Sequence, residues 1–126
     1  MKIISFVLLG FVVLAAGSVL AQAPADLAAP GTGIYEENCA PCHRSNGEGL
    51  AVKFPALHKN PLVLGDPQPA LATVLNGRKG ELGLMPAWKD KLDDGQIAAV
   101  VTYIRNAWTN KASGVTPAMV KEVRDK

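Results

Sequence analysis

The clearest periodic pattern in the 126-residue chain lies near its C-terminus. Apolar residues recur there at i, i+3, i+4, i+7 and i+11, which is the spacing of one helix face. They are Ile97, Val100, Val101, Ile104 and Trp108. Asp93 precedes them as an N-cap candidate, and Gln96 three residues later completes a capping-box pattern. The pattern predicts an amphipathic helix whose apolar face runs from Ile97 to Trp108.

Weaker patterns predict three more short helices. They cover about residues 31–39, 69–75 and 116–124. Gly77 lies just past the second helix, and the third has Thr116 as its cap and Pro117 at its first position. Residues 44–66 hold several glycines and prolines, and residues 76–91 are rich in glycine and lysine, so both favour loops. No segment shows sustained strand alternation. The fold class is therefore predicted to be all-α, with three to four short helices and long loops.

The N-terminal 21 residues have the pattern of a secretory signal. Lys2 supplies the positive n-region, and an apolar stretch runs from about Ile3 to Ala16. Small residues then lead to a cleavage site after Ala21, with Ala23 as the second choice. The apolar stretch is shorter than a comfortable membrane span, so cleavage is favoured over a retained anchor. The expected divisions are a signal peptide (1–21), a flexible leader (22–30), one domain (31–109) and a C-terminal extension with a short helix (110–126).

Charge and size narrow the class of protein further. Lys2 is the only charged residue of the signal, which leaves 12 basic and 11 acidic residues in a mature chain of 105. This balance, without a basic run, argues against nucleic-acid binding. No membrane span is expected after cleavage. Short helices and long loops bury little apolar surface, so a bound group or a staple is expected to complete the core.

The chain has two cysteines, Cys39 and Cys42, and His43 follows directly. C-x-x-C-H is a haem attachment sequence, in which two thiols add to the vinyl groups and the next residue offers an imidazole to the iron. A thioredoxin-like pair would need a βαβ setting, and a zinc site would need further ligands. A disulfide would close a tiny loop and leave His43 unexplained. The motif therefore predicts one covalent haem c, with His43 as an axial ligand.

Met85 is the leading candidate for the second axial ligand. It precedes Pro86, which favours an extended and rigid backbone, and a thioether is the usual companion of histidine in electron-transfer haems. Met119 lies on the apolar side of the predicted terminal helix, where packing is the simpler account. His58, 15 residues after His43, and an open sixth site remain alternatives.

Two further side chains are candidates for binding the haem propionates. Arg78 offers a planar fork that fits a carboxylate, although a solvated surface arginine is an equal alternative. Trp88 could donate its indole N–H while packing on the macrocycle, or it could be an ordinary core residue. Pro55 is a candidate to lie near His43, but the acceptor for the second imidazole nitrogen is not identified. Loop lysines that could form a docking ring for acidic partners, or could simply aid solubility, are Lys53, Lys59, Lys79, Lys89 and Lys91.

Over residues 31–109 the sequence resembles a class I, single-haem cytochrome c. The resemblance rests on Gly31 and Tyr35 ahead of the C-x-x-C-H box, on the methionine-proline loop, and on Tyr103 in the long C-terminal helix. It implies a cytochrome c fold wrapped around one covalent haem. It also implies that the first and last helices cross where Gly31 or Gly33 contacts Tyr103.

The stretch from Met85 to Trp108 and the tail from Val115 to Arg124 resemble a narrower group. These are bacterial periplasmic cytochromes, free or serving as domains of dehydrogenase and oxidase complexes. The resemblance implies a periplasmic electron carrier, not an enzyme, between a dehydrogenase or quinol-oxidising donor and an oxidase or reductase. Two alternatives stay open: a dedicated cytochrome subunit of an alcohol- or aldehyde-type dehydrogenase, and a gas-binding haem sensor or enzyme with an open sixth site.

Overall fold

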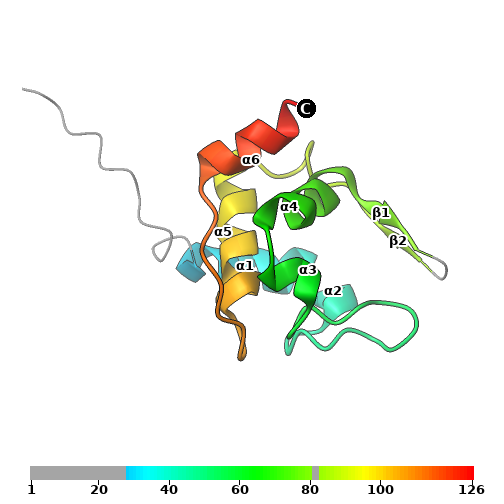
Figure 1. Cartoon of the computed structure of the whole chain (residues 1–126). Helices are drawn as coiled ribbons and strands as arrows, with labels where there is room; N and C mark the ends of the chain where they lie inside the picture. Colours follow the sequence, from blue (N-terminus) through cyan, green and yellow to red (C-terminus); the bar gives the residue numbers. More distant parts are fainter. Residues whose placement is uncertain (1–27, 81–82) are drawn as a thin grey trace, which may run out of the picture.

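The computed structural model describes residues 28–80 and 83–126, and the expected signal peptide and most of the leader lie outside these ranges. The described chain is mainly helical, which confirms the all-α prediction (Figure 1). Within it, no helix has both the length and the apolar character needed to cross a membrane. The helices are α1 (Ala28–Asn38), α2 (Ala40–His43), α3 (Pro61–Leu64), α4 (Pro67–Asn76), α5 (Asp94–Asn106) and α6 (Pro117–Arg124). The strands are β1 (Arg78–Lys79) and β2 (Leu84–Met85), which form one antiparallel hairpin.

α5 is the central helix, and the predicted capping box fixes its start. The Asp93 carboxylate accepts the backbone N–H of Gln96 at 2.8 Å, and the Gln96 side-chain oxygen accepts the backbone N–H of Asp93 at 3.0 Å. These two bonds satisfy amides that have no partner inside the helix. The apolar face is buried from Ile97 to Ile104, as its spacing predicted.

The prediction that this apolar face continues to Trp108 was wrong, because α5 ends at Asn106. A longer helix would pair the carbonyl of Ile104 with the amide of Trp108. Instead that carbonyl accepts the side-chain amide of Asn110 at 2.8 Å. The backbone of Trp108 is left-handed, with φ of 58°, so Trp108 does not continue the helix.

α1 owes its helical state to packing against α5. Its sequence includes Gly31 and Gly33, which are poor helix formers, and a helix of this length is marginal by itself. α1 packs across α5, and a Cβ added at Gly31 would stand 2.8 Å from the Cβ of Tyr103. A Cβ at Gly33 would have no neighbour within 4 Å, so Gly31 makes the contact expected at the crossing. α1 is described from Ala28, inside the expected leader and three residues before the expected start.

The predictions for α4 and α6 were confirmed with small shifts. α4 begins at Pro67, two residues early, because the Asp66 carboxylate accepts the Gln68 amide at 3.0 Å and caps the helix. In α6 the Thr116 hydroxyl oxygen accepts the Met119 amide at 3.3 Å, and proline follows the cap as expected. Both helices therefore begin at side chains suited to capping.

Three short elements were not predicted. α3 is one turn within the expected loop 44–66, capped by the Asn60 side chain, which accepts the Leu62 amide at 2.9 Å. The β1–β2 hairpin lies within the expected loop 76–91. α2 lies inside the C-x-x-C-H box itself. Each is too short to produce a periodic pattern, so it could not be predicted from residue spacing.

Candidate haem site

The C-x-x-C-H box forms a single helical turn. The His43 amide donates to the Cys39 carbonyl at 2.8 Å, and the Arg44 amide donates to the Ala40 carbonyl at 2.7 Å. Residues at i, i+3 and i+4 share one face of a helix, so this turn directs Cys39, Cys42 and His43 to the same side. Both cysteines are free thiols and half-buried.

The thiols fit covalent attachment better than a metal-thiolate site. Burial raises the pKa of Cys39 to about 11, with a smaller contribution from Cys42, so its thiol stays protonated at neutral pH. Across residues 28–80 and 83–126, no group of three or more histidine, cysteine or acidic side chains is arranged to hold a metal ion. Two thiols beside one imidazole are the donor set that haem c requires.

His43 is held by a hydrogen bond from its second ring nitrogen. Its Nδ1 lies 2.9 Å from the carbonyl oxygen of Pro55, and its side chain is buried. A carbonyl can only accept, so Nδ1 carries a proton and Nε2 is the ring nitrogen available to a metal. Histidines that bind metals usually have such a second partner, which fixes the tautomer and the ring orientation. The acceptor that the sequence left unidentified is thus the Pro55 carbonyl.

Gly49 makes room for this acceptor. Its amide donates to the His43 carbonyl at 2.9 Å, and its φ is 63°. A Cβ at Gly49 would stand 2.3 Å from the Phe54 carbonyl oxygen and 2.6 Å from that of Pro55. Only glycine lets the two backbone segments approach so closely.

Met85 lies in β2, directly opposite Arg78 in β1. The backbone that follows passes over Gly77, where a Cβ would stand 2.5 Å from the Met85 carbonyl oxygen. The Trp88 amide then donates to the Val74 carbonyl of α4 at 3.1 Å. Met85 itself is half-buried. The hydrogen bond at Trp88 fixes the segment that carries its thioether to the end of α4.

The segments that carry His43's acceptor and Met85 meet at the surface. A turn over residues 50–54, closed by a bridge between Leu50 and Phe54, carries Val52 with 87% of its surface exposed. A Cβ at Gly83 would stand 3.6 Å from the Phe54 ring. Figure 1 shows the hairpin and this loop extending on the same side of the helices. The loop that carries the acceptor of His43 and the hairpin that carries Met85 are therefore neighbours.

The other two candidates for the sixth ligand have contacts elsewhere. His58 Nε2 shares a hydrogen bond of 2.6 Å with the Thr109 hydroxyl, and its ring centroid lies 6.3 Å from that of Trp108. Met119 packs against the hydrophobic core, as expected for a residue of the terminal helix. These contacts favour Met85 as the available sulfur or nitrogen donor.

Arg78 and Trp88 flank the Met85 segment. Arg78 is exposed, Trp88 is half-buried, and the Lys91 ammonium lies 5.2 Å from the Trp88 ring centroid. Neither the Arg78 guanidinium nor the Trp88 indole N–H donates to an acceptor in the described part of the protein. The five loop lysines are all exposed, and none pairs with a described carboxylate.

The sequence did not reveal the residues that hold the loop after His43. The Trp108 indole N–H donates to the Ser45 carbonyl at 2.8 Å, and a Cβ at Gly47 would stand 2.4 Å from the Trp108 ring. The Asn110 amide donates to the Leu57 carbonyl at 3.1 Å. The glycines at 47 and 49, both with positive φ, were the only local signal of such close packing.

The helix crossing and the C-x-x-C-H turn together define a c-type cytochrome, a class that carries covalently bound haem c. Residues 26–104 match the family described as cytochrome c oxidase, cbb3-type, subunit III. The chain belongs to this family. Its mostly helical architecture is the cytochrome c fold, as the resemblance implied.

Relatives include cytochrome subunits of larger enzymes. The chain is 40% identical over 106 residues to the alcohol dehydrogenase (quinone) cytochrome c subunit of Gluconacetobacter polyoxogenes, covering 76% of this chain and 22% of that protein. It is 40% identical over 82 residues to the cbb3-type cytochrome c oxidase subunit CcoP of Azospirillum brasilense, covering 60% and 27%. It is 34% identical over 97 residues to the gluconate 2-dehydrogenase cytochrome c subunit of Pantoea cypripedii, covering 70% and 22%. The chain thus spans only about a quarter or less of these relatives.

A solved structure shares the fold. The c-type cytochrome XoxG from Methylobacterium extorquens AM1 superposes with a TM-score of 0.50 at 25% sequence identity. The match covers 79% of this chain and 65% of that one. The fold assignment therefore has support from both sequence and structure.

Proposed function

We propose that this chain is a single-electron carrier with one haem c, bound covalently by Cys39 and Cys42 and ligated axially by His43 and Met85. The main support is the hydrogen bond from His43 Nδ1 to the Pro55 carbonyl at 2.9 Å. It orients the imidazole so that Nε2 is the ring nitrogen available to iron, beside the thiols of Cys39 and Cys42. That arrangement is suited to holding iron firmly and serves no acid–base reaction.

The haem, when bound, supplies the one-electron chemistry between ferrous and ferric iron. The chain would contribute two ligands, His43 and Met85, on anchored backbone segments, so that the protein around the haem would change little between the two oxidation states. The Pro55 carbonyl makes the imidazole a stronger donor, and a thioether favours the reduced state relative to a second histidine. Arg78 and Trp88, whose donors face no described acceptor, would bind the propionates. The proposed role is therefore transfer of electrons without catalysis.

We further propose that residues 1–21 are a signal peptide, followed by a leader over 22–30, a domain over 31–109 and an extension over 110–126. The mature protein would act in the periplasm, where the C-x-x-C-H box receives its haem. N-terminal sequencing of the exported protein would show a new terminus after Ala21, or after Ala23. An uncleaved N-terminus would contradict this part of the proposal.

The proposed partners are redox proteins. The donor would be a dehydrogenase or a quinol-oxidising complex, and the acceptor an oxidase or a reductase. The relatives named above are cytochrome subunits of dehydrogenases and of an oxidase, which also supports a role as a dedicated subunit. Co-purification of a dehydrogenase with the natively expressed protein would favour the dedicated subunit over a free carrier.

The identity of the sixth ligand separates this proposal from a gas-binding sensor or enzyme. We expect the ferric protein to show the far-red sulfur-to-iron charge-transfer band, and the reduced protein to bind CO only slowly. Met85→Ala should abolish the band and admit CO, whereas Met119→Leu should leave both unchanged. Rapid CO binding by the unmodified protein, unaffected by Met85→Ala, would contradict the proposal.

A further inference from the structure

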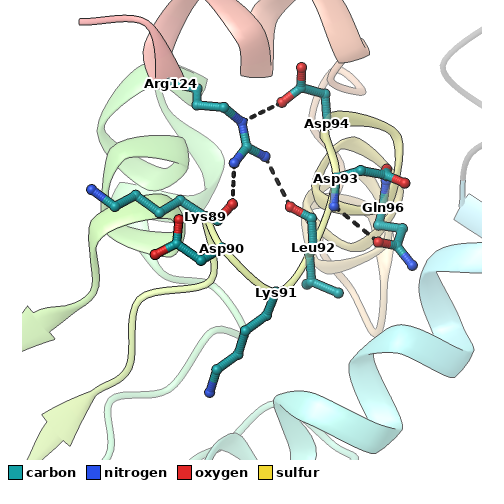
Figure 2. A pocket seen from close by; sticks show the side chains of 8 residues that line it. All are labelled: Lys89, Asp90, Lys91, Leu92, Asp93, Asp94, Gln96 and Arg124. Atoms are coloured by element: carbon teal, nitrogen blue, oxygen red, sulfur yellow. Dashed lines mark hydrogen bonds and ion pairs between the residues drawn. The ribbon is translucent and has the colours of Figure 1, made fainter.

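The guanidinium of Arg124, the last residue of α6, binds three acceptors at once. Its Nε donates to Asp94 Oδ1 at 2.6 Å, and its Nη2 donates to the Leu92 carbonyl at 3.0 Å. Its Nη1 donates to the Lys89 carbonyl. Figure 2 shows the side chain reaching from α6 to the segment over residues 89–92, along the rim of a shallow pocket. Arg124 lies beyond residues 26–104, the part matched to the family.

The chain from Met85, at the end of β2, to Leu92 is called here the Met85 loop, and residues 89–92 are its last part. Both backbone polar groups of Lys89 are held, because its N–H donates to the Leu75 carbonyl of α4 at 3.1 Å and its carbonyl accepts from Arg124. The preceding amide, of Trp88, donates to the Val74 carbonyl. Only two residues, Pro86 and Ala87, separate Met85 from Trp88. The anchored backbone at Trp88 and Lys89 would therefore oppose movement of Met85.

Apolar contacts also hold α6 in place. Val120 is fully buried in the core, and Met119 and Val123 pack against the same core. The pair with Asp94 alone would contribute little, since both side chains are partly exposed, at 24% and 29%. The two backbone carbonyls are the contacts that only a planar fork can reach together. The main contacts of Arg124 are therefore those that hold the backbone of residues 89–92.

We propose that Arg124 is a positioning residue for the Met85 loop: by binding the Lys89 and Leu92 carbonyls it suppresses release of the methionine from its axial position. This inference rests on the proposed function, in which Met85 is an axial ligand. It assigns to the C-terminal extension a role in retaining that ligand. Loss of the two carbonyl bonds should raise the population of the open loop by on the order of tenfold, as expected for removing charged hydrogen bonds.

The test compares haem-loaded, full-length Arg124→Gln and Arg124→Lys with the unmodified protein. Lys121→Gln is the matched control, because Lys121 is on the same helix, is exposed and, among the described residues, pairs only with Asp125. The readouts are the CO-binding rate of the reduced protein and the temperature at which the far-red band of the ferric protein disappears. Far-UV circular dichroism reports unfolding of the helices separately.

We expect Arg124→Gln to bind CO about tenfold faster and to lose the far-red band at a lower temperature, before the helices unfold. Arg124→Lys should behave like Arg124→Gln, because an ammonium can pair with Asp94 but cannot span both carbonyls. Lys121→Gln should match the unmodified protein. The inference would be overturned if Arg124→Gln also matched the unmodified protein or if Arg124→Lys restored its behaviour in full. It would also be overturned if the band were lost only together with the helices.

Failure of this inference is distinguishable from failure of the proposed function. Absence of the far-red band in the unmodified protein, or its survival in Met85→Ala, would contradict Met85 ligation itself. A band that Met85→Ala abolishes and that Arg124→Gln leaves equally heat-stable, with no change in CO binding, would contradict only the role of Arg124.

Discussion

The phenol of Tyr35 donates a hydrogen bond of 2.6 Å to the backbone carbonyl of Arg44, the residue that follows His43. Tyr35 is fully buried, and its ring centroid lies 5.3 Å from that of Tyr103 and 5.6 Å from that of Trp108. Arg44 has φ of 62° and ψ of 155°, a conformation that costs energy for any residue but glycine. The helix crossing therefore holds the chain in a strained turn just after the C-x-x-C-H box.

Tyr35→Phe should change stability in a pH-dependent way. At pH 7 the loss of the hydrogen bond should cost about 1 kcal/mol. Burial raises the pKa of Tyr35 far above its usual value, so above about pH 10 the unfolded phenol ionises while the folded one does not. The unmodified protein then loses about 1.4 kcal/mol per pH unit that the phenylalanine variant keeps.

Denaturant unfolding at pH 7 to 11, followed by far-UV circular dichroism, measures this difference. The deficit of Tyr35→Phe should shrink above pH 10 and vanish roughly one unit higher. Burial also raises the pKa of Tyr103, but that residue is present in both proteins and cancels. A deficit that stays constant across this range would contradict the prediction.

Gly31→Ala should destabilise the helix crossing. The added Cβ would stand 2.1 Å from the Ala99 carbonyl oxygen of α5, so the two helices must move apart. Overpacking of this kind costs about 2 kcal/mol in the free energy of unfolding. Gly33→Ala is the matched control, with open space at the new Cβ, and should be neutral or stabilising by up to about 1 kcal/mol. Equal effects of the two substitutions would show that α1 does not depend on the close approach.

Gly49→Ala should raise the reduction potential. Its Cβ would displace the Phe54 and Pro55 carbonyls and so weaken the hydrogen bond from His43 Nδ1. A weaker bond makes the imidazole a poorer donor and disfavours the ferric state. Loss of about 1 kcal/mol would correspond to roughly 40 mV for a one-electron couple. Redox titration of the haem-loaded protein measures the shift, with Gly33→Ala expected to leave the potential unchanged.

The parts that could be predicted from sequence are those whose causes lie within a few residues. The C-x-x-C-H box is contiguous, and the cap of α5 needs only Asp93 and Gln96. The reading of Trp108 as part of the helix failed for the opposite reason. The helix ends because Asn110 takes a carbonyl from its last turn, and spacing alone does not show such competition.

Arg105 shows why the supporting contacts could not be predicted. Its position on α5 reads as polar, yet only 2% of its surface is exposed. Its Nη1 donates to the carbonyls of Val63 and Gly65, about 40 residues earlier in the chain. Which carbonyls lie within reach is decided by tertiary packing. The same holds for the Pro55 carbonyl beside His43.

The crossing of α1 and α5 joins the two ends of the chain that encloses the site. Everything between them, from Cys39 to Asp93, is tied at both ends, and the exposed turn at Val52 lies inside it. A peptide bond broken at this turn would leave two fragments, each with one helix of the crossing and one candidate axial ligand. The covalent cofactor would stay with the shorter fragment, and the longer one would return Met85 by docking α5 onto α1. The two fragments should thus still assemble around the site although the backbone is broken at this turn.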